Sequence, residues 1–188
     1  MMKTNLSANR MVSKTDGRIR FRGLIDSLEA ETIEAQVLAD SIGEQYYCAA
    51  LGEVLDYLRQ IMAAEVKESP FAVPYLFGLS VEELHRQTHD AAGAFGLPGR
   101  PLPAYEQGPL AARLNTLRAR TREAELCALR VFSGDERGQA ARSGGEAGAS
   151  QPGAADAVPP REDLAAALNR LSSALYWLFC RAVVKITC

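Results

Sequence analysis

The sequence predicts an all-α protein, a single domain built as a bundle of four to five helices with a disordered insertion before the last helix. Four long stretches repeat apolar residues at the three- and four-residue spacing of an amphipathic helix. No stretch alternates apolar and polar residues clearly enough to predict a strand. With 188 residues the chain can bury one substantial core. We therefore assign residues 24–188 to one helical domain.

The amino-acid composition limits the kinds of partner and cellular location that we expect for the protein. The formal net charge is −2 and 47% of the residues are hydrophobic, an ordinary globular balance without a broad electrostatic attraction to nucleic acid. Four scattered cysteines form no CxxC pair, which favours reduced thiols over a structural zinc site or a disulfide framework. Neither a membrane span nor a secretory signal is recognisable. We expect a cytoplasmic protein with no membrane partner.

Residues 1–23 are polar and basic, and we expect them to form a loop that leads into the first helix. Asp26, with Glu29 three residues later, has the pattern of a residue that caps the N-terminus of that helix. A basic loop that runs into a helix N-terminus can bind an anion. Lys14 and Arg18 of this loop are therefore candidate phosphate-binding residues, although no Walker or GxGxxG motif accompanies them.

Two more helices follow. The second is predicted over residues 47–67 and ends before Pro70, because proline cannot continue a helix. Ser80 followed by Glu83 is a capping-box pattern, which predicts the start of a short helix that ends near His89.

The second half of the chain alternates irregular and helical stretches. Glycine and proline dominate residues 90–108, which predicts a long loop. Residues 109–132 repeat apolar side chains with the 4-3 spacing of a helix that packs in a bundle. Residues 133–160 have no apolar periodicity and cannot bury enough surface to offset their ordering entropy, which predicts disorder. A last helix is predicted over residues 161–185.

A charged stripe lies beside the apolar seam of the third long helix. Arg118, Arg122 and Glu125 are spaced four and three apart, so they share one side of that helix. On spacing alone, a solvated edge or a ladder of ion pairs is the favoured interpretation. The alternative is a pair of guanidinium groups directed at phosphates, with Glu125 orienting one of them.

Two further features have both a structural and a functional interpretation. Asn169 falls on a wide apolar face of the last helix, so we expect it to be buried and bonded either to a structural partner or to a ligand. His85 and His89 have metal-ligand spacing, but no cysteine or carboxylate stands at a matching position. We interpret them as surface histidines and predict no metal site.

Together these motifs resemble those of the ATP:corrinoid adenosyltransferases, in particular the ethanolamine-utilisation branch. That family's first loop and helix resemble VSKTDGRIRFRGLIDSLEAE, and one of its connecting segments is similar to LFGLSVEELHRQTH. Its arginine-rich helix resembles LNTLRARTREAEL, and its last-helix signature resembles ALNRLSSALYWLFCR. The four motifs occur in the family's order and cover nearly all of the chain outside residues 133–160.

The resemblance implies a homotrimer with active sites between subunits. It also implies an enzyme that transfers the 5′-deoxyadenosyl group of ATP to reduced cobalamin and releases triphosphate. Mg²⁺ bound to the phosphates is expected. The product would supply ethanolamine ammonia-lyase, which with its reactivase is a candidate partner, in the cytoplasm or a bacterial microcompartment. The alternative is a non-catalytic helical protein that binds a corrinoid or nucleotide, or a scaffold of a metabolic assembly.

The resemblance also implies roles for individual residues. Those assigned to ATP are Lys14, Arg122, Glu125, Asn169 and Arg170, to which the basic loop adds Arg18. Asp26 and Arg118 would pair across the subunit interface and hold the site together. Tyr105, in the glycine- and proline-rich loop, is the candidate for contact with the corrinoid.

Overall fold

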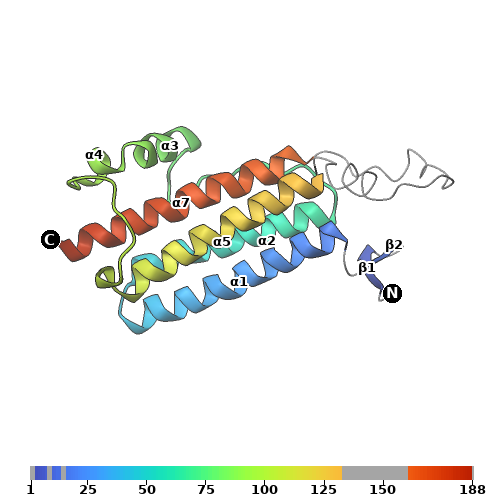
Figure 1. Ribbon diagram of the computed structural model, residues 1–188, viewed down its shortest axis with the longest axis horizontal. Helices are drawn as coiled ribbons and strands as arrows, with labels where there is room; N and C mark the ends of the chain where they lie inside the picture. Colours follow the sequence, from blue (N-terminus) through green and yellow to red (C-terminus); the bar gives the residue numbers. More distant parts are fainter. Residues whose placement is uncertain (1–2, 8–9, 14–15, 133–160, 188) are drawn as a thin grey trace, which may run out of the picture.

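In the computed structural model, the described residues are 3–7, 10–13, 16–132 and 161–187. Within them, four long helices lie side by side (Figure 1): α1 (Gly17–Ser41), α2 (Gln45–Val66), α5 (Gly108–Phe132) and α7 (Glu162–Thr187). The shorter elements are α3 (Val81–His89), α4 (Ala91–Phe95) and the 3-10 helix η1 (Tyr105–Gln107). The predicted all-α bundle is confirmed, and the long helices begin and end close to the predicted positions except at the start of α1.

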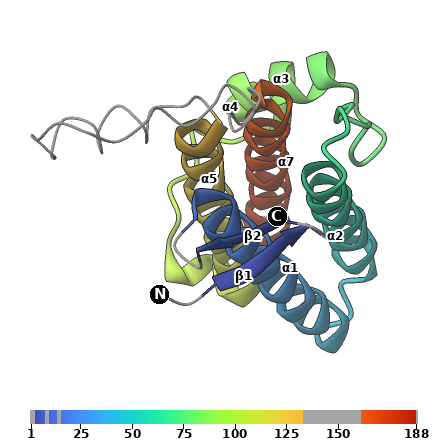
Figure 2. The ribbon, with the colours of Figure 1, turned by 90° about the vertical axis from the view of Figure 1, so that its right-hand side faces the viewer.

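The bundle has a closed side and a looser side. Helix α5 packs along α7 and α1, and α1 packs along α2, whereas α2 and α7 meet over a short stretch. Viewed end-on, the four helices surround one core, and α3 and α4 lie outside α7 (Figure 2). The largest fully buried side chains include Phe21, Ile25, Leu28, Leu51, Tyr57, Leu58, Ile61, Leu114, Leu117, Leu164, Leu168 and Phe179. A stretch that could cross a membrane is not found among the described helices.

Helix α1 begins earlier than predicted. It starts at Gly17, and the Oδ1 atom of its N-cap residue Asp16 accepts a hydrogen bond of 2.9 Å from the backbone N–H of Arg18. Asp26 therefore lies inside the helix, where its side chain is exposed. The prediction that Asp26 caps the helix is wrong, because the basic residues before it are helical.

The N-terminal residues also differ from the predicted loop. Strands β1 (Lys3–Ser7) and β2 (Arg10–Ser13) pair as an antiparallel hairpin. Strands this short carry too few alternating positions to stand out in the sequence. Lys14 and the predicted disordered insertion, residues 133–160, lie outside the described residues.

A buried carboxylate explains why α1 extends so far. Glu65 of α2 has a fully buried side chain, and its two oxygens each accept a hydrogen bond of 2.5 Å, one from Nε of Arg18 and one from Nε of Arg22. Arg18 also donates a hydrogen bond of 2.7 Å from Nη1 to Glu68 and one of 3.1 Å from Nη2 to the backbone oxygen of Glu65. These charge-assisted bonds fix the first turns of α1 against the end of α2.

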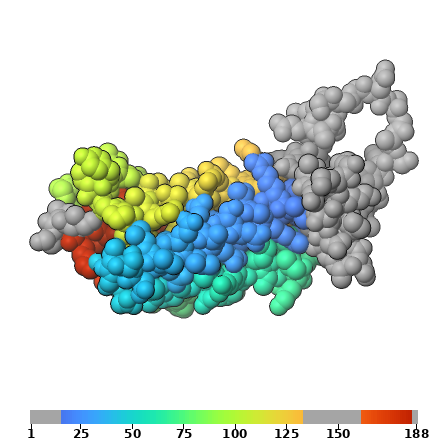
Figure 3. Space-filling view, turned by 90° about the horizontal axis from the view of Figure 1, so that it is seen from below, coloured from blue at the N-terminus to red at the C-terminus, as the bar shows by residue number. Residues whose placement is uncertain are grey.

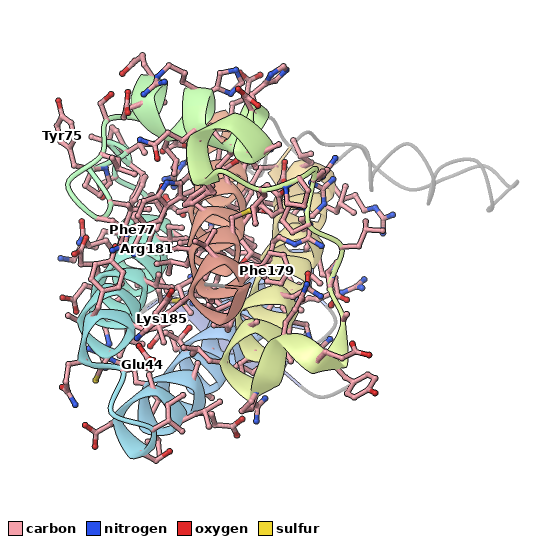
Figure 4. All side chains as sticks on the ribbon, turned by 90° about the vertical axis from the view of Figure 1, so that its left-hand side faces the viewer. Glu44, Tyr75, Phe77, Phe179, Arg181 and Lys185 are labelled. Carbon is pink, nitrogen blue, oxygen red and sulfur yellow. The ribbon has the colours of Figure 1, made fainter. Side chains whose placement is uncertain are left out.

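The looser side between α2 and α7 is closed by aromatic and charged side chains (Figure 4). The ring of Phe77 stacks on Trp177 with centroids 5.7 Å apart, and the Arg181 guanidinium also lies near Trp177. At the far end, Nζ of Lys185 lies 2.7 Å from both carboxylate oxygens of Glu44. The stacking of Phe77 on Trp177 holds the segment that leads from α2 to α3 over this seam.

Breaking the buried cluster should destabilise the fold strongly. Replacing Glu65→Ala leaves two arginines without the carboxylate they share, which costs about 3–5 kcal/mol of unfolding free energy. Glu34→Ala is the matched control, because it removes an exposed partner of Arg113 and should cost less than about 1 kcal/mol. Urea unfolding of both variants measures the difference, and equal losses would contradict a structural role for Glu65.

Candidate functional site

A cleft of about 450 Å³ opens between α3 and α4 on one side and α5 and α7 on the other. The polar residues that line it are His85, Thr88, His89, Asp90, Arg100, Arg118, Arg122, Ser172, Ser173 and Tyr176. Its size is in the range of small-molecule sites, and its lining is rich in cations. The helical periodicity of α5 and α7 delivers these side chains, since each helix uses its other sides to pack in the bundle.

Four of the five arginines of α5 divide into two groups, and the fifth, Arg130, lies away from the cleft. Those facing α1 are paired: Nη2 of Arg113 lies 2.9 Å from Glu34, and Nε of Arg120 lies 3.4 Å from Glu31. Those facing the cleft have no acidic partner among the described residues. Arg118 donates only to the Oδ1 atom of Asn115, at 3.1 Å, and Arg122 is exposed. Guanidinium groups without counter-ions in a cleft are suited to bind an anion.

Helix α7 contributes hydroxyl groups to the opposite wall. Ser172 is buried and Ser173 half-buried. The hydroxyl of Tyr176 is buried and makes no hydrogen bond within the described residues, although Cys180 and Arg100 lie close to it. Burial raises the pKa of the Tyr176 phenol and of the Cys180 thiol. Both groups therefore stay protonated at neutral pH and are poor nucleophiles.

Helix α3 forms the outer wall of the cleft. It begins as predicted, with Oγ of Ser80 accepting a hydrogen bond of 3.1 Å from the backbone N–H of Glu83. The ring centroids of His85 and His89 are 5.9 Å apart on one side of this helix. Three or more histidine, cysteine or acidic residues that could hold a metal ion are not grouped anywhere in the described part of the chain.

Glu125 and Asn169 join α5 to α7 next to the cleft. Asn169 donates a hydrogen bond of 2.9 Å from Nδ2 to Oε1 of Glu125. Both residues were candidates in the sequence, but Asn169 is exposed and the expectation that it is buried is wrong. The apolar residues of its row on α7, Ala165, Phe179 and Val183, are buried as expected, but Asn169 itself lies at the surface, where α5 and α7 meet. Glu125 also positions Asn169 rather than an arginine.

The remaining predicted site residues do not line this cleft. Arg18 is held in the Glu65 cluster, which gives it a structural role in place of the predicted contact with ATP. Arg170 interacts with residues of α2 and α3 on another side of α7. Asp26 is exposed on α1, and Tyr105, on η1, is 87% exposed.

Several cleft residues were missed in the sequence. Arg100 lies in a loop that has no periodicity, and its guanidinium stands 5.5 Å from the ring centre of Tyr176. The four-residue spacing of His85 and His89 was noticed, but a helix pattern does not show which neighbours cover a given face. Tyr176 stood in a row interpreted as apolar.

Comparison with known proteins agrees with these features. The family model described as cobalamin adenosyltransferase matches residues 2–182. The corrinoid adenosyltransferase EutT of Salmonella typhimurium (strain LT2) is 31% identical over 182 residues, and EutT of Escherichia coli (strain K12) is equally similar. Each alignment covers 97% of this chain and 59% of the relative, so the chain spans about three fifths of the length of these curated relatives.

No solved structure matches the chain significantly. The family match nevertheless extends over nearly the whole chain, and it includes α1, α2 and α5 and most of α7, up to residue 182. It also includes the arginines of α5 and the Asn169 segment of α7, which meet beside the cleft. The chain belongs to the cobalamin adenosyltransferase family.

Proposed function

We propose that this chain transfers the 5′-deoxyadenosyl group of ATP to reduced cobalamin, which yields adenosylcobalamin and triphosphate. The observation that carries the proposal is the pair Arg118 and Arg122, which face the cleft without an acidic partner in the described part of the chain. The other arginines named on α5, facing α1, have such partners. A guanidinium without an acidic partner in its own chain suits an external anion, a polyphosphate for Arg122 and a carboxylate of the next subunit for Arg118, and the relatives' name mentions a corrinoid.

The reaction requires little acid–base catalysis from the protein. The cobalt(I) of the reduced corrinoid supplies an electron pair to the 5′ carbon of ATP, so that a cobalt–carbon bond forms. The bond between that carbon and its phosphate oxygen breaks, and triphosphate leaves with the electron pair. The protein has to align the two substrates and stabilise the charge on the leaving group. The neutral Tyr176 and Cys180 in and beside the cleft fit this requirement.

In this proposal Arg122 binds the triphosphate. Glu125 holds the side-chain amide of Asn169, whose oxygen is left available to accept a hydrogen bond from the nucleotide. Lys14 would add a further phosphate contact. Tyr105 remains the candidate for the corrinoid, because its exposed ring offers a large apolar surface.

We expect Mg²⁺ to enter the cleft bound to ATP. Polyphosphates commonly bind Mg²⁺, whereas the cleft is lined by cations and has Asp90 as its acidic residue. The Oδ1 atom of Asp90 already accepts a hydrogen bond of 3.0 Å from the backbone N–H of Gly93. The side chains here do not form a protein site for Mg²⁺, so we assign the ion to the phosphates of ATP.

We also propose a homotrimer. Asp26, Ile33 and Val37 share one exposed side of α1, and Ile33 and Val37 are 44% and 64% exposed. Helix α1 runs along one face of the molecule between α5 and α2 (Figure 3). On α5, Leu126 follows Arg122 by one turn and is 55% exposed. Two different apolar patches that bind each other generate a ring when the rotation between subunits closes, and we propose that it closes after three subunits, with Asp26 of one against Arg118 of the next.

The proposed biological setting follows from the same resemblance. The product would supply ethanolamine ammonia-lyase, with that enzyme or its reactivase as a partner, in the cytoplasm or in a bacterial microcompartment. The second candidate function is a corrinoid- or nucleotide-binding protein without catalysis, or a scaffold. The cleft can bind an anion in either case, so turnover is what distinguishes the two.

The first prediction concerns Arg122. The wild-type chain, given ATP, Mg²⁺ and cobalamin under strongly reducing conditions, should convert the corrinoid spectrum to that of adenosylcobalamin. Arg122→Ala should remove about 1.5–3 kcal/mol of transition-state stabilisation, the value of a charge-assisted bond. This loss should lower kcat/KM roughly ten- to a hundredfold. Arg120→Ala is the control, since it removes an α5 arginine that pairs with Glu31, and it should leave activity within about twofold.

Each alternative outcome has a clear meaning. Wild-type protein that binds ATP in calorimetry without turnover would contradict the enzyme and favour the binding protein. If the wild type is active and the Arg122→Ala variant is equally active, only the role assigned to Arg122 is contradicted.

The second prediction concerns the interface. Wild-type protein should sediment as a trimer, and Asp26→Arg or Arg118→Asp alone should weaken assembly because like charges would meet. The double variant should restore the trimer, since the pair is reversed. Glu34→Arg is the control, because the partner of Glu34 lies in the same chain. A monomeric wild type, or single variants that assemble normally, would refute the interfacial pair.

A further inference from the structure

We infer that His85 and His89 of α3 bind the polyphosphate in this cleft, in their protonated imidazolium form. This inference rests on the proposed function and extends it to a wall of the cleft that contributes no residue to the proposal above. The ligand class is a linear polyphosphate, either the triphosphate arm of ATP or the triphosphate released after transfer.

The first support is position. Both histidines line the same cleft as Arg118 and Arg122, although they come from a different helix. Their ring centroids are 5.9 Å apart and both side chains are exposed. An extended anion lying in the cleft would therefore have arginines on one side and imidazoles on the other.

The second support is charge. The titratable and charged groups that face these imidazoles are Arg118 and Arg122 from α5, Arg100 from the loop after α4, Tyr176 from α7 and Asp90. Tyr176 is neutral, because burial raises its pKa, and Asp90 caps the N-terminus of α4. Within one chain, three guanidinium groups face one engaged carboxylate. In the proposed trimer Asp26 of the next subunit would neutralise Arg118, and Arg100 and Arg122 would still make the cleft repel cations. The histidine pair is thus poorly placed for a metal ion and well placed for an anion.

The third support is the set of hydroxyl groups that line the cleft from α3 and α7. Thr88, Ser172 and Ser173 add hydroxyl groups, which can donate to phosphate oxygens. In the structure Thr88 and Ser173 donate their hydroxyl protons to backbone oxygens of their own helices, so each hydroxyl would have to rotate away from that bond to donate to a phosphate oxygen. The Tyr176 hydroxyl, buried without a hydrogen-bond partner among the described residues, is a further donor.

The direction of the pH dependence follows from linkage. A bound anion favours the charged imidazolium over the neutral imidazole. The histidine contribution is therefore largest at low pH, where the imidazoles are charged, and is lost as the pH rises and they become neutral. Arginine stays charged throughout and contributes at every pH.

The test measures the affinity of inorganic tripolyphosphate by calorimetry at constant ionic strength, at about pH 5.5 and about pH 8. Tripolyphosphate titrates in this range as well, so the readout is the difference between variants at each pH. Relative to wild type, His85→Gln/His89→Gln should bind about tenfold more weakly at the lower pH and equally at the higher pH. His85→Lys/His89→Lys should bind at least as tightly as wild type at the higher pH, because lysine keeps its charge.

Arg86→Gln is the matched control, because Arg86 lies on α3 between the histidines, pairs with Glu83 and is outside the cleft lining. It should bind tripolyphosphate like wild type at both pH values. A glutamine double variant that matches wild type at both pH values would overturn the inference, and so would an Arg86→Gln variant that weakens as much as the double variant. Neither result affects the proposed function, which is tested by adenosylation in the wild-type chain.

Discussion

The packing of α5 along α7 is the constraint on which the rest of the molecule depends. The contact is the most extensive between any two elements, and small residues on the inner side of α5, among them Thr121, Ala124 and Ala128, allow the helices to approach closely. Thr121 satisfies its buried hydroxyl on the backbone oxygen of Leu117, at 2.8 Å. Because this seam is fixed, the next side of α5 and the next side of α7 form two walls of one cleft.

The distribution of carboxylates decides what that cleft can do. Acidic residues of α1 neutralise the arginines on one side of α5, and Glu65 neutralises Arg18 and Arg22 at the base of the bundle. On the cleft side, Glu125 is engaged by Asn169 instead of an arginine. The chain is nearly neutral overall, yet this allocation leaves positive charge concentrated where α3, α5 and α7 meet. An anion-binding site needs such a local excess and no net charge on the whole protein.

Sequence reasoning succeeded where periodicity carries the information. The seams of the long helices, the Ser80 cap and the shared side of Arg118 and Arg122 all follow from spacing, and the structure confirms them. It failed where a long-range partner decides the outcome. The start of α1 depends on Glu65, which lies 47 residues from Arg18, and the cleft position of Arg100 depends on how an aperiodic loop folds back. Neither of these long-range contacts can be predicted from the local sequence pattern.

The most direct test of the central claim is a crystal structure of the chain with a non-reactive ATP analogue and a corrinoid bound. The account predicts that phosphate oxygens lie about 2.7–2.9 Å from the guanidinium of Arg122, the distance of a charge-assisted bond, and that the triphosphate runs along the cleft between α5 and α3. A nucleotide bound elsewhere, for example at the Arg181 and Lys185 end of the seam between α2 and α7, would contradict the account.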